Sequence, residues 1–197
     1  MVTVRQLERL WLARQYDPLL RLVLETRPEA SVRLVSHLAR SIPTAAMAVV
    51  RLDELNQSHT PFCARMLRAV LAGQEADGGW GDPLNTAICL RALLCSDGDG
   101  PAIDRALTYL ANLQKSDGLW PREPLRRLPA DPFVSAFILF HLADDHRFAS
   151  AVRLDDTLRW FRTHHNKLDL ETARLWRMIA IRRSAVPLTS NSSHIWS

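Results

Sequence analysis

Residues 71–83 read Leu-Ala-Gly-Gln-Glu-Ala-Asp-Gly-Gly-Trp-Gly-Asp-Pro, and residues 111–121 read Ala-Asn-Leu-Gln-Lys-Ser-Asp-Gly-Leu-Trp-Pro. In each segment an apolar run at helical spacing ends in glutamine, an Asp-Gly pair follows, and a tryptophan comes six positions after the glutamine. The second copy begins forty residues after the first. Repeats of this period are typical of stacked supersecondary units. The two segments therefore predict an architecture of repeated helical hairpins.

The rest of the chain also predicts helices. Sustained alternation of β-branched and polar residues, the usual mark of a strand, is missing. Prolines stand where helices would begin, as in Asp17-Pro18, Thr60-Pro61 and Asp131-Pro132. Proline suits the first helical position, and aspartate and threonine are good N-caps. We expect an all-α chain with helices at 3–15, 18–26, 29–40, 44–56, 61–73, 84–95, 101–114, 132–144, 151–164 and 169–183.

Composition favours one folded domain with a helical arm. The chain has 197 residues, of which 47% are hydrophobic and 23% charged, so it can bury a core. No apolar run approaches the ~20 residues that a membrane span needs. The N-terminus predicts an amphipathic helix rather than the apolar core of a signal peptide, and we expect a cytoplasmic protein.

The three cysteines, Cys63, Cys89 and Cys95, show no Cys-x-x-Cys spacing. This argues against a disulfide framework and against a structural zinc site. We expect Cys89 and Cys95 to pack as small hydrophobic side chains. His141, alone on the helix expected at 132–144, is read as structural rather than as a metal ligand, and no cofactor is expected.

Arginine supplies nearly all of the positive charge, since the net charge is +4 and only Lys115 and Lys167 are lysines. Arginine suits bidentate contacts with carboxylates and phosphates. The best candidates for binding an anion or a partner lie on the last expected helix: Arg174, Arg177, Arg182 and Arg183. Nucleic-acid binding is the least favoured use, because it usually requires a denser basic patch.

The Gln-x-x-Asp-Gly-x-Trp pattern resembles the QW-type repeat of the terpenoid cyclase and protein prenyltransferase superfamily. The resemblance is specific at 67–95 and 106–121, degenerate from 130 to about 183, and not visible in 1–60. In that family helical hairpins form an α/α toroid whose inner helices line a cavity for isoprenoid chains. The resemblance implies a partial toroid over 61–183. Residues 1–60 lack the repeat and are expected to form an N-terminal helical extension, and the polar composition near the C-terminus predicts a flexible tail over 184–197.

The resemblance also implies which helices face inward. The helices at 84–95, 132–144 and 169–183 would be inner, and those at 101–114 and 151–164 outer. Small residues near the inner helix starts, Thr86-Ala87, Ser135-Ala136 and Thr172-Ala173, let neighbouring helices approach closely. In the family's repeats, the glutamine bonds backbone at a neighbouring helix end and the tryptophan packs beside it. Gln74, Trp80, Gln114 and Trp120 are therefore expected to be structural.

The acid and metal motifs of the family are both interrupted here. Triterpene cyclases carry Asp-x-Asp-Asp-Thr-Ala, in which the middle aspartate protonates the substrate, whereas residues 82–87 read Asp-Pro-Leu-Asn-Thr-Ala. Leu84 cannot donate a proton. Protein prenyltransferases use an Asp-x-Cys pair on zinc, whereas residues 131–133 read Asp-Pro-Phe. Asp82 and Asp131 are the remaining catalytic candidates.

Three functional hypotheses follow. The first is a non-catalytic helical-repeat scaffold that binds a protein partner through its concave face or its basic last helix. The second is an isoprenoid or lipid binder, or a cyclase- or prenyltransferase-like enzyme, with a divergent site near Asp82 and Asp131. The third is nucleic-acid binding through the arginines. An open arc of hairpins could also be completed by forming a homodimer.

Overall fold

The computed structural model describes residues 41–96, 100–125 and 127–185. Within these ranges the regular structure is helical, and the β-bridges are limited to an isolated antiparallel one between Pro121 and Ala130. This confirms the all-α prediction. The elements are α4 Ile42–Glu54, α5 Pro61–Ala72, α6 Pro83–Cys95, α7 Gly100–Leu113, α8 Pro132–Leu142, α9 His146–Ala151, α10 Leu154–His164, the 3-10 helix η1 His165–Lys167 and α11 Leu170–Ala185. The helices predicted at 3–15, 18–26 and 29–40 lie outside the described residues.

The prediction was wrong about the segment between α8 and α10. One helix was expected at 151–164, but the chain forms the short helix α9 first and then α10. Asp145 directly follows the helix expected at 132–144. Its carboxylate caps α9 and accepts hydrogen bonds from the backbone N–H groups of Arg147 and Phe148 at 2.8 and 3.0 Å. Val152 is extended and separates the two helices.

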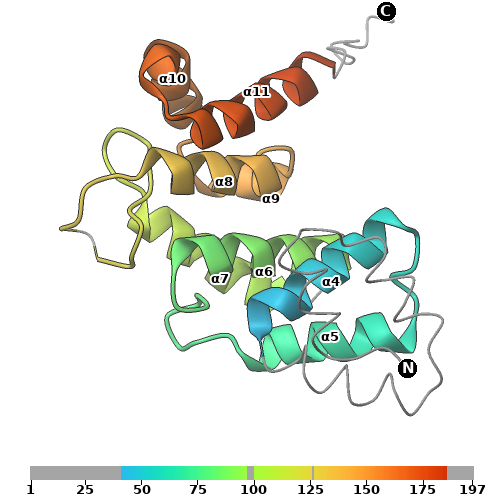
Figure 1. Ribbon diagram of the computed structural model, residues 1–197. Coiled ribbons are helices and arrows are strands. Elements are labelled where there is room, and N and C mark those ends of the chain that lie inside the picture. The colour runs from blue at the N-terminus through green and yellow to red at the C-terminus, as the bar shows by residue number, and fades with distance from the viewer. Residues whose placement is uncertain (1–40, 97–99, 126, 186–197) are drawn as a thin grey trace, which may run out of the picture.

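The helices stack in sequence from α4 and α5 at one end to α10 and α11 at the other (Figure 1). In one row, α6 contacts α4 and α8, and α8 contacts α11. Beside this row, α5 contacts α4 and α6, and α7 contacts α6 and α9. Thus α4, within the predicted N-terminal extension, packs directly against the first repeat. The boundary at residue 60 and the closure of the row into a partial toroid stay predictions.

Residue chemistry explains which helices form the first row. α6 and α8 are apolar around most of their circumference, as helices covered by neighbours on several sides must be. The hydroxyl residues near the starts of α6, α8 and α11 are fully buried: Thr86, Ser135 and Thr172. Their small size allows close approach, and their hydroxyl groups have hydrogen-bond partners.

Aromatic residues and cysteines complete the core. Trp80 and Trp120 are buried, whereas Trp160 and Trp176 are half-buried against the core edge. Trp11 and Trp196 lie outside the described residues. Cys63 and Cys89 are buried free thiols and Cys95 is half-buried. Burial raises the pKa of all three thiols, in the case of Cys95 to about 11, so they behave as packing residues.

Candidate functional site

The first repeat loop folds on itself between α5 and α6. The backbone N–H of Glu75 donates to the carbonyl of Gly79 at 2.9 Å, and the Asp77 carboxylate accepts the N–H of Gly79 at 2.9 Å. Gly78 has a φ of +92°. Aspartate bonding the backbone two positions on, followed by a left-handed glycine, is a standard turn chemistry.

The second loop, between α7 and α8, has the same geometry forty residues later. The N–H of Lys115 donates to the carbonyl of Leu119 at 2.8 Å, and Asp117 accepts the N–H of Leu119 at 3.0 Å. Gly118 has a φ of +86°. The Asp-Gly pair in each sequence segment therefore encodes one loop conformation, used twice.

Each glutamine ties its loop to a helix of the next hairpin. Gln74 Nε2 donates to the carbonyl of Gly78 at 3.0 Å and to the carbonyl of Ala102, in the first turn of α7, at 2.8 Å. Its Oε1 accepts a hydrogen bond from the Arg105 guanidinium on α7. One amide side chain thus links the end of α5 to α7.

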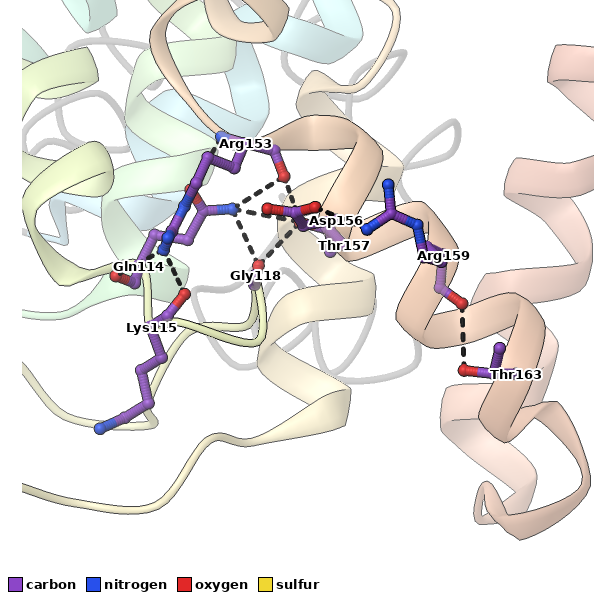
Figure 2. Close-up of polar contacts among 8 residues, drawn as sticks. All are labelled: Gln114, Lys115, Gly118, Arg153, Asp156, Thr157, Arg159 and Thr163. Carbon is purple, nitrogen blue, oxygen red and sulfur yellow. Dashed lines mark hydrogen bonds and ion pairs between the residues drawn. The ribbon is translucent and has the colours of Figure 1, made fainter.

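Gln114 repeats these contacts one hairpin later (Figure 2). Its Nε2 donates to the Gly118 carbonyl at 2.8 Å and to Thr157 Oγ1 at 3.1 Å, and its Oε1 accepts the Arg153 N–H at 2.8 Å. The Arg153 guanidinium also donates to the Lys115 carbonyl. The end of α7 is therefore joined to the start of α10.

Each tryptophan connects the helix before its loop to the helix after it. The indole N–H of Trp80 donates to the Val70 carbonyl at 2.8 Å, and its backbone N–H donates to Thr86 Oγ1 at 3.0 Å. For Trp120 the partners are the Leu110 carbonyl at 2.8 Å and Ser135 Oγ at 2.9 Å. Buried polar groups that are paired in this way hold a core in one arrangement.

The two acidic candidates both cap helices. Asp82 Oδ1 accepts the backbone N–H of Asn85 at 2.8 Å, and Oδ2 accepts the Asn85 side-chain amide at 2.8 Å. Asp131 Oδ1 accepts the N–H groups of Phe133 and Val134 at 2.9 and 3.2 Å. The two acids do not form a common site, because Asp82 caps the start of α6 and Asp131 caps the start of α8.

The four candidate arginines of α11 separate into two groups. Arg182 and Arg183 donate to the carbonyls of Phe140 and Ala143 at 3.1 Å each, so they hold α11 against the end of α8. Arg174 pairs with Glu171 at 3.1 Å and is exposed, as is Arg177. Sequence spacing alone did not separate these two uses.

A pocket of about 270 Å³ lies where α4, α6, α8 and α11 meet. Of its residues, sequence reasoning had singled out only Arg182 and His141 as individual candidates, because four helices far apart in sequence build it. Burial, with Arg91 and Arg182, lowers the pKa of His141 to about 4. The lining is Met47, Val50, Arg51, Glu54, Arg91, Phe140, His141, Asp144 and Arg182.

No protein-family model matches the chain, and comparisons with curated proteins and with solved structures gave no match either. The resemblance to the terpenoid cyclase and prenyltransferase superfamily accordingly remains a prediction based on the repeat segments.

Two further kinds of site, metal-binding and membrane-spanning, concern residues 41–96, 100–125 and 127–185. Among these residues, no group of three or more histidine, cysteine, aspartate or glutamate side chains is placed to hold a metal ion. None of the helices that the structure describes is long and apolar enough to cross a membrane.

Proposed function

We propose that this chain is a non-catalytic helical-repeat scaffold that binds a protein partner through the outer face of α11. The main support is a set of exposed apolar side chains on α11. Leu170, Met178 and Ile181 are 67%, 41% and 60% exposed, and their spacing places them on one helix face. Aligned apolar side chains left in water are typical of interaction surfaces.

The position of α11 in the row supports this proposal. α6 lies between α4 and α8 in the row, and α8 lies between α6 and α11, whereas α11 packs against α8 and stacks its Trp176 on Phe161 of α10. An added helix from a partner would extend the row by the same packing. The apolar stripe on α11 is the surface on which such a helix would lie.

Charge indicates what kind of helix would fit. Arg174 and Arg177 lie along the stripe, and Arg177 has no polar partner in the described part of the chain. The Arg174–Glu171 pair is exposed, and exposed pairs contribute little, so Arg174 can exchange its partner at small cost. The partner is therefore an amphipathic helix with acidic residues beside its apolar face.

The capping contacts favour the scaffold over the catalytic alternatives. Asp82 and Asp131 use their oxygens to hold helix starts, and Leu84 stands where the cyclases carry their acid. In this proposal the chain is a divergent relative of the repeat superfamily. It has retained the repeat loops and has lost the catalytic activity. The proposal also places the protein in the cytoplasm, in keeping with the free thiols of all three cysteines.

Site-specific photo-crosslinking in the source cells tests the proposal. A photo-reactive phenylalanine at Met178 should give a discrete crosslinked band, and the same group at Arg68, exposed on α5, should not. Adding Ile181→Glu should abolish the Met178 band. Equal bands at both positions, or none at Met178, would overturn the proposal.

Two other outcomes would favour the alternatives. A Met178 band at twice the chain mass would mean that a second copy occupies this face, so that the surface makes a homodimer. An isoprenoid or other lipid retained in native mass spectrometry and removed by mild organic extraction would replace the scaffold with a lipid binder.

A further inference from the structure

We infer that the pocket between α4, α6, α8 and α11 binds a small organic monocarboxylate with an apolar body. This goes beyond the proposed scaffold function and does not depend on it, because the pocket lies between the helices of the row and the partner surface lies on the outer face of α11.

The size and wall of the pocket indicate a small, partly apolar occupant. Its volume of about 270 Å³ is just below the range of roughly 300–1,000 Å³ that is typical of ligand pockets, so only a small molecule would fit. Met47, Val50 and Phe140 supply apolar surface on one part of the lining. A hydrocarbon or aromatic body in contact with these side chains would be removed from water.

The charged groups leave one guanidinium available. Arg51 is paired with Glu54 at 2.5 Å. The guanidinium of Arg182 donates to the Phe140 carbonyl at 3.1 Å, and its Cζ lies 4.2 Å from the centre of the Phe140 ring. Arg91, in contrast, has no hydrogen bond or ion pair among the described residues, and its charge acts on its neighbours His141 and Cys95. A guanidinium in a partly desolvated pocket pairs most favourably with a planar carboxylate through two parallel hydrogen bonds.

The same surroundings disfavour both a cation and a dianion. Three arginines repel a cationic ligand. Glu54 and Asp144 also line the pocket, and they lie at the C-terminal ends of α4 and α8, where the helix dipole is negative. A phosphate ester with two charges would be repelled by these groups, whereas a carboxylate with one charge balances Arg91.

The pocket is also separate from the acids singled out in the sequence. Asp82 and Asp131 cap the N-terminal ends of α6 and α8. The pocket side chains Arg91 and His141 belong to the C-terminal halves of the same helices. The two sets thus occupy opposite ends of the same two helices, α6 and α8.

Methionine-methyl NMR of the full chain tests this inference. Met47 lines the pocket, Met66 is buried in the core, and Met178 is exposed on α11. Sodium benzoate or sodium hexanoate should shift the Met47 methyl resonance saturably and leave those of Met66 and Met178 in place. Benzamide, the neutral analogue of benzoate, and phenyl phosphate should each bind at least tenfold more weakly than benzoate.

Arginine variants test the anchoring group. Arg91→Gln should weaken benzoate binding at least tenfold, Arg91→Lys should weaken it less, and Arg68→Gln on exposed α5 should leave it unchanged. Arg91→Lys retains the charge, so it provides the test if Arg91→Gln fails to fold.

The inference is overturned if neither carboxylate shifts Met47 saturably, if benzamide or phenyl phosphate binds as tightly as benzoate, or if the folded Arg91 variants bind like the native chain. Ile181→Glu should not change benzoate binding, so the two proposals fail independently.

Discussion

Gln114 Nε2 donates to Thr157 Oγ1 at 3.1 Å, and this hydroxyl donates in turn to the Gly118 carbonyl at 2.7 Å (Figure 2). Thr157 is fully buried in the first turn of α10, and Gln114 directly follows α7 and begins the second repeat loop. One buried hydroxyl therefore joins two hairpins. The stacking of hairpins in this region depends on a small number of such polar contacts.

Thr157→Val removes this contact without changing the shape of the side chain. The Gly118 carbonyl would lose one of its two donors and keep Gln114 Nε2, and Gln114 would lose one acceptor, so the loss should be that of an ordinary hydrogen bond, about 0.5–1.5 kcal/mol in the free energy of unfolding. Urea denaturation followed by circular dichroism measures the change. Thr163→Val is the matched control, since the hydroxyl of exposed Thr163 contacts only groups of its own helix, the carbonyls of Arg159 and Trp160 and Nδ1 of His164. A Thr157 variant no less stable than the Thr163 variant would show that the contact does not hold the hairpins together.

Gly118→Ala should be more destabilising still. Gly118 has a φ of +86°, and an added Cβ would lie 2.7 Å from the backbone nitrogen of Thr157. Gly81→Ala separates the two effects, because Gly81 has a φ of +83° but its added Cβ would only approach Glu75 Oε1 at 3.9 Å. Backbone strain alone costs about 1–2 kcal/mol. We expect Gly81→Ala to lose about that much stability in thermal denaturation, and Gly118→Ala to lose more.

A third glycine completes this comparison. Gly100 begins α7, and an added Cβ there has no described atom within 4 Å. Gly100→Ala should leave stability unchanged or raise it slightly, by less than about 1 kcal/mol. If all three variants melted together, docking of the second repeat loop on α10 would not be a stabilising contact.

Local sequence determined what could be predicted. The loops after Gln74 and Gln114 follow from Asp-Gly turn chemistry, and most helix starts follow from proline at the first position. The splitting of the segment after α8 was missed because the Asp145 cap competes with the helical pattern around it. The pocket around Arg91 was not visible at all, because it depends on helices brought together by tertiary packing.

Asp82 is predicted to act as a cap. Asp82→Ala should cost about 1 kcal/mol of stability, and Asp82→Asn only a few tenths, because asparagine caps helices as well as aspartate does. Chemical denaturation of the two variants side by side measures this. Equal losses would instead show that the start of α6 needs the carboxylate itself rather than a neutral cap.

His141 is predicted to make stability fall as the solution is acidified. Burial, with Arg91 and Arg182 nearby, lowers its pKa from 6.5 to about 4 in the folded chain. Below pH 6.5 the unfolded chain therefore binds a proton that the folded chain does not, and stability declines until about pH 4, where the folded chain binds it too. Because the ring is partly exposed, we expect a loss of about 2 kcal/mol over this range rather than the full thermodynamic value.

His141→Gln isolates the contribution of this imidazole, which lines the pocket, from the rest of the acid response of the chain. The variant should lose less stability than the native chain between pH 7 and pH 4 in urea denaturation. His146→Gln, at an exposed position at the start of α9, should retain the native slope. Identical slopes for the native chain and His141→Gln would mean that the imidazole is already protonated, or freely solvated, in the folded state, and the pocket would then be far wetter than its packing indicates.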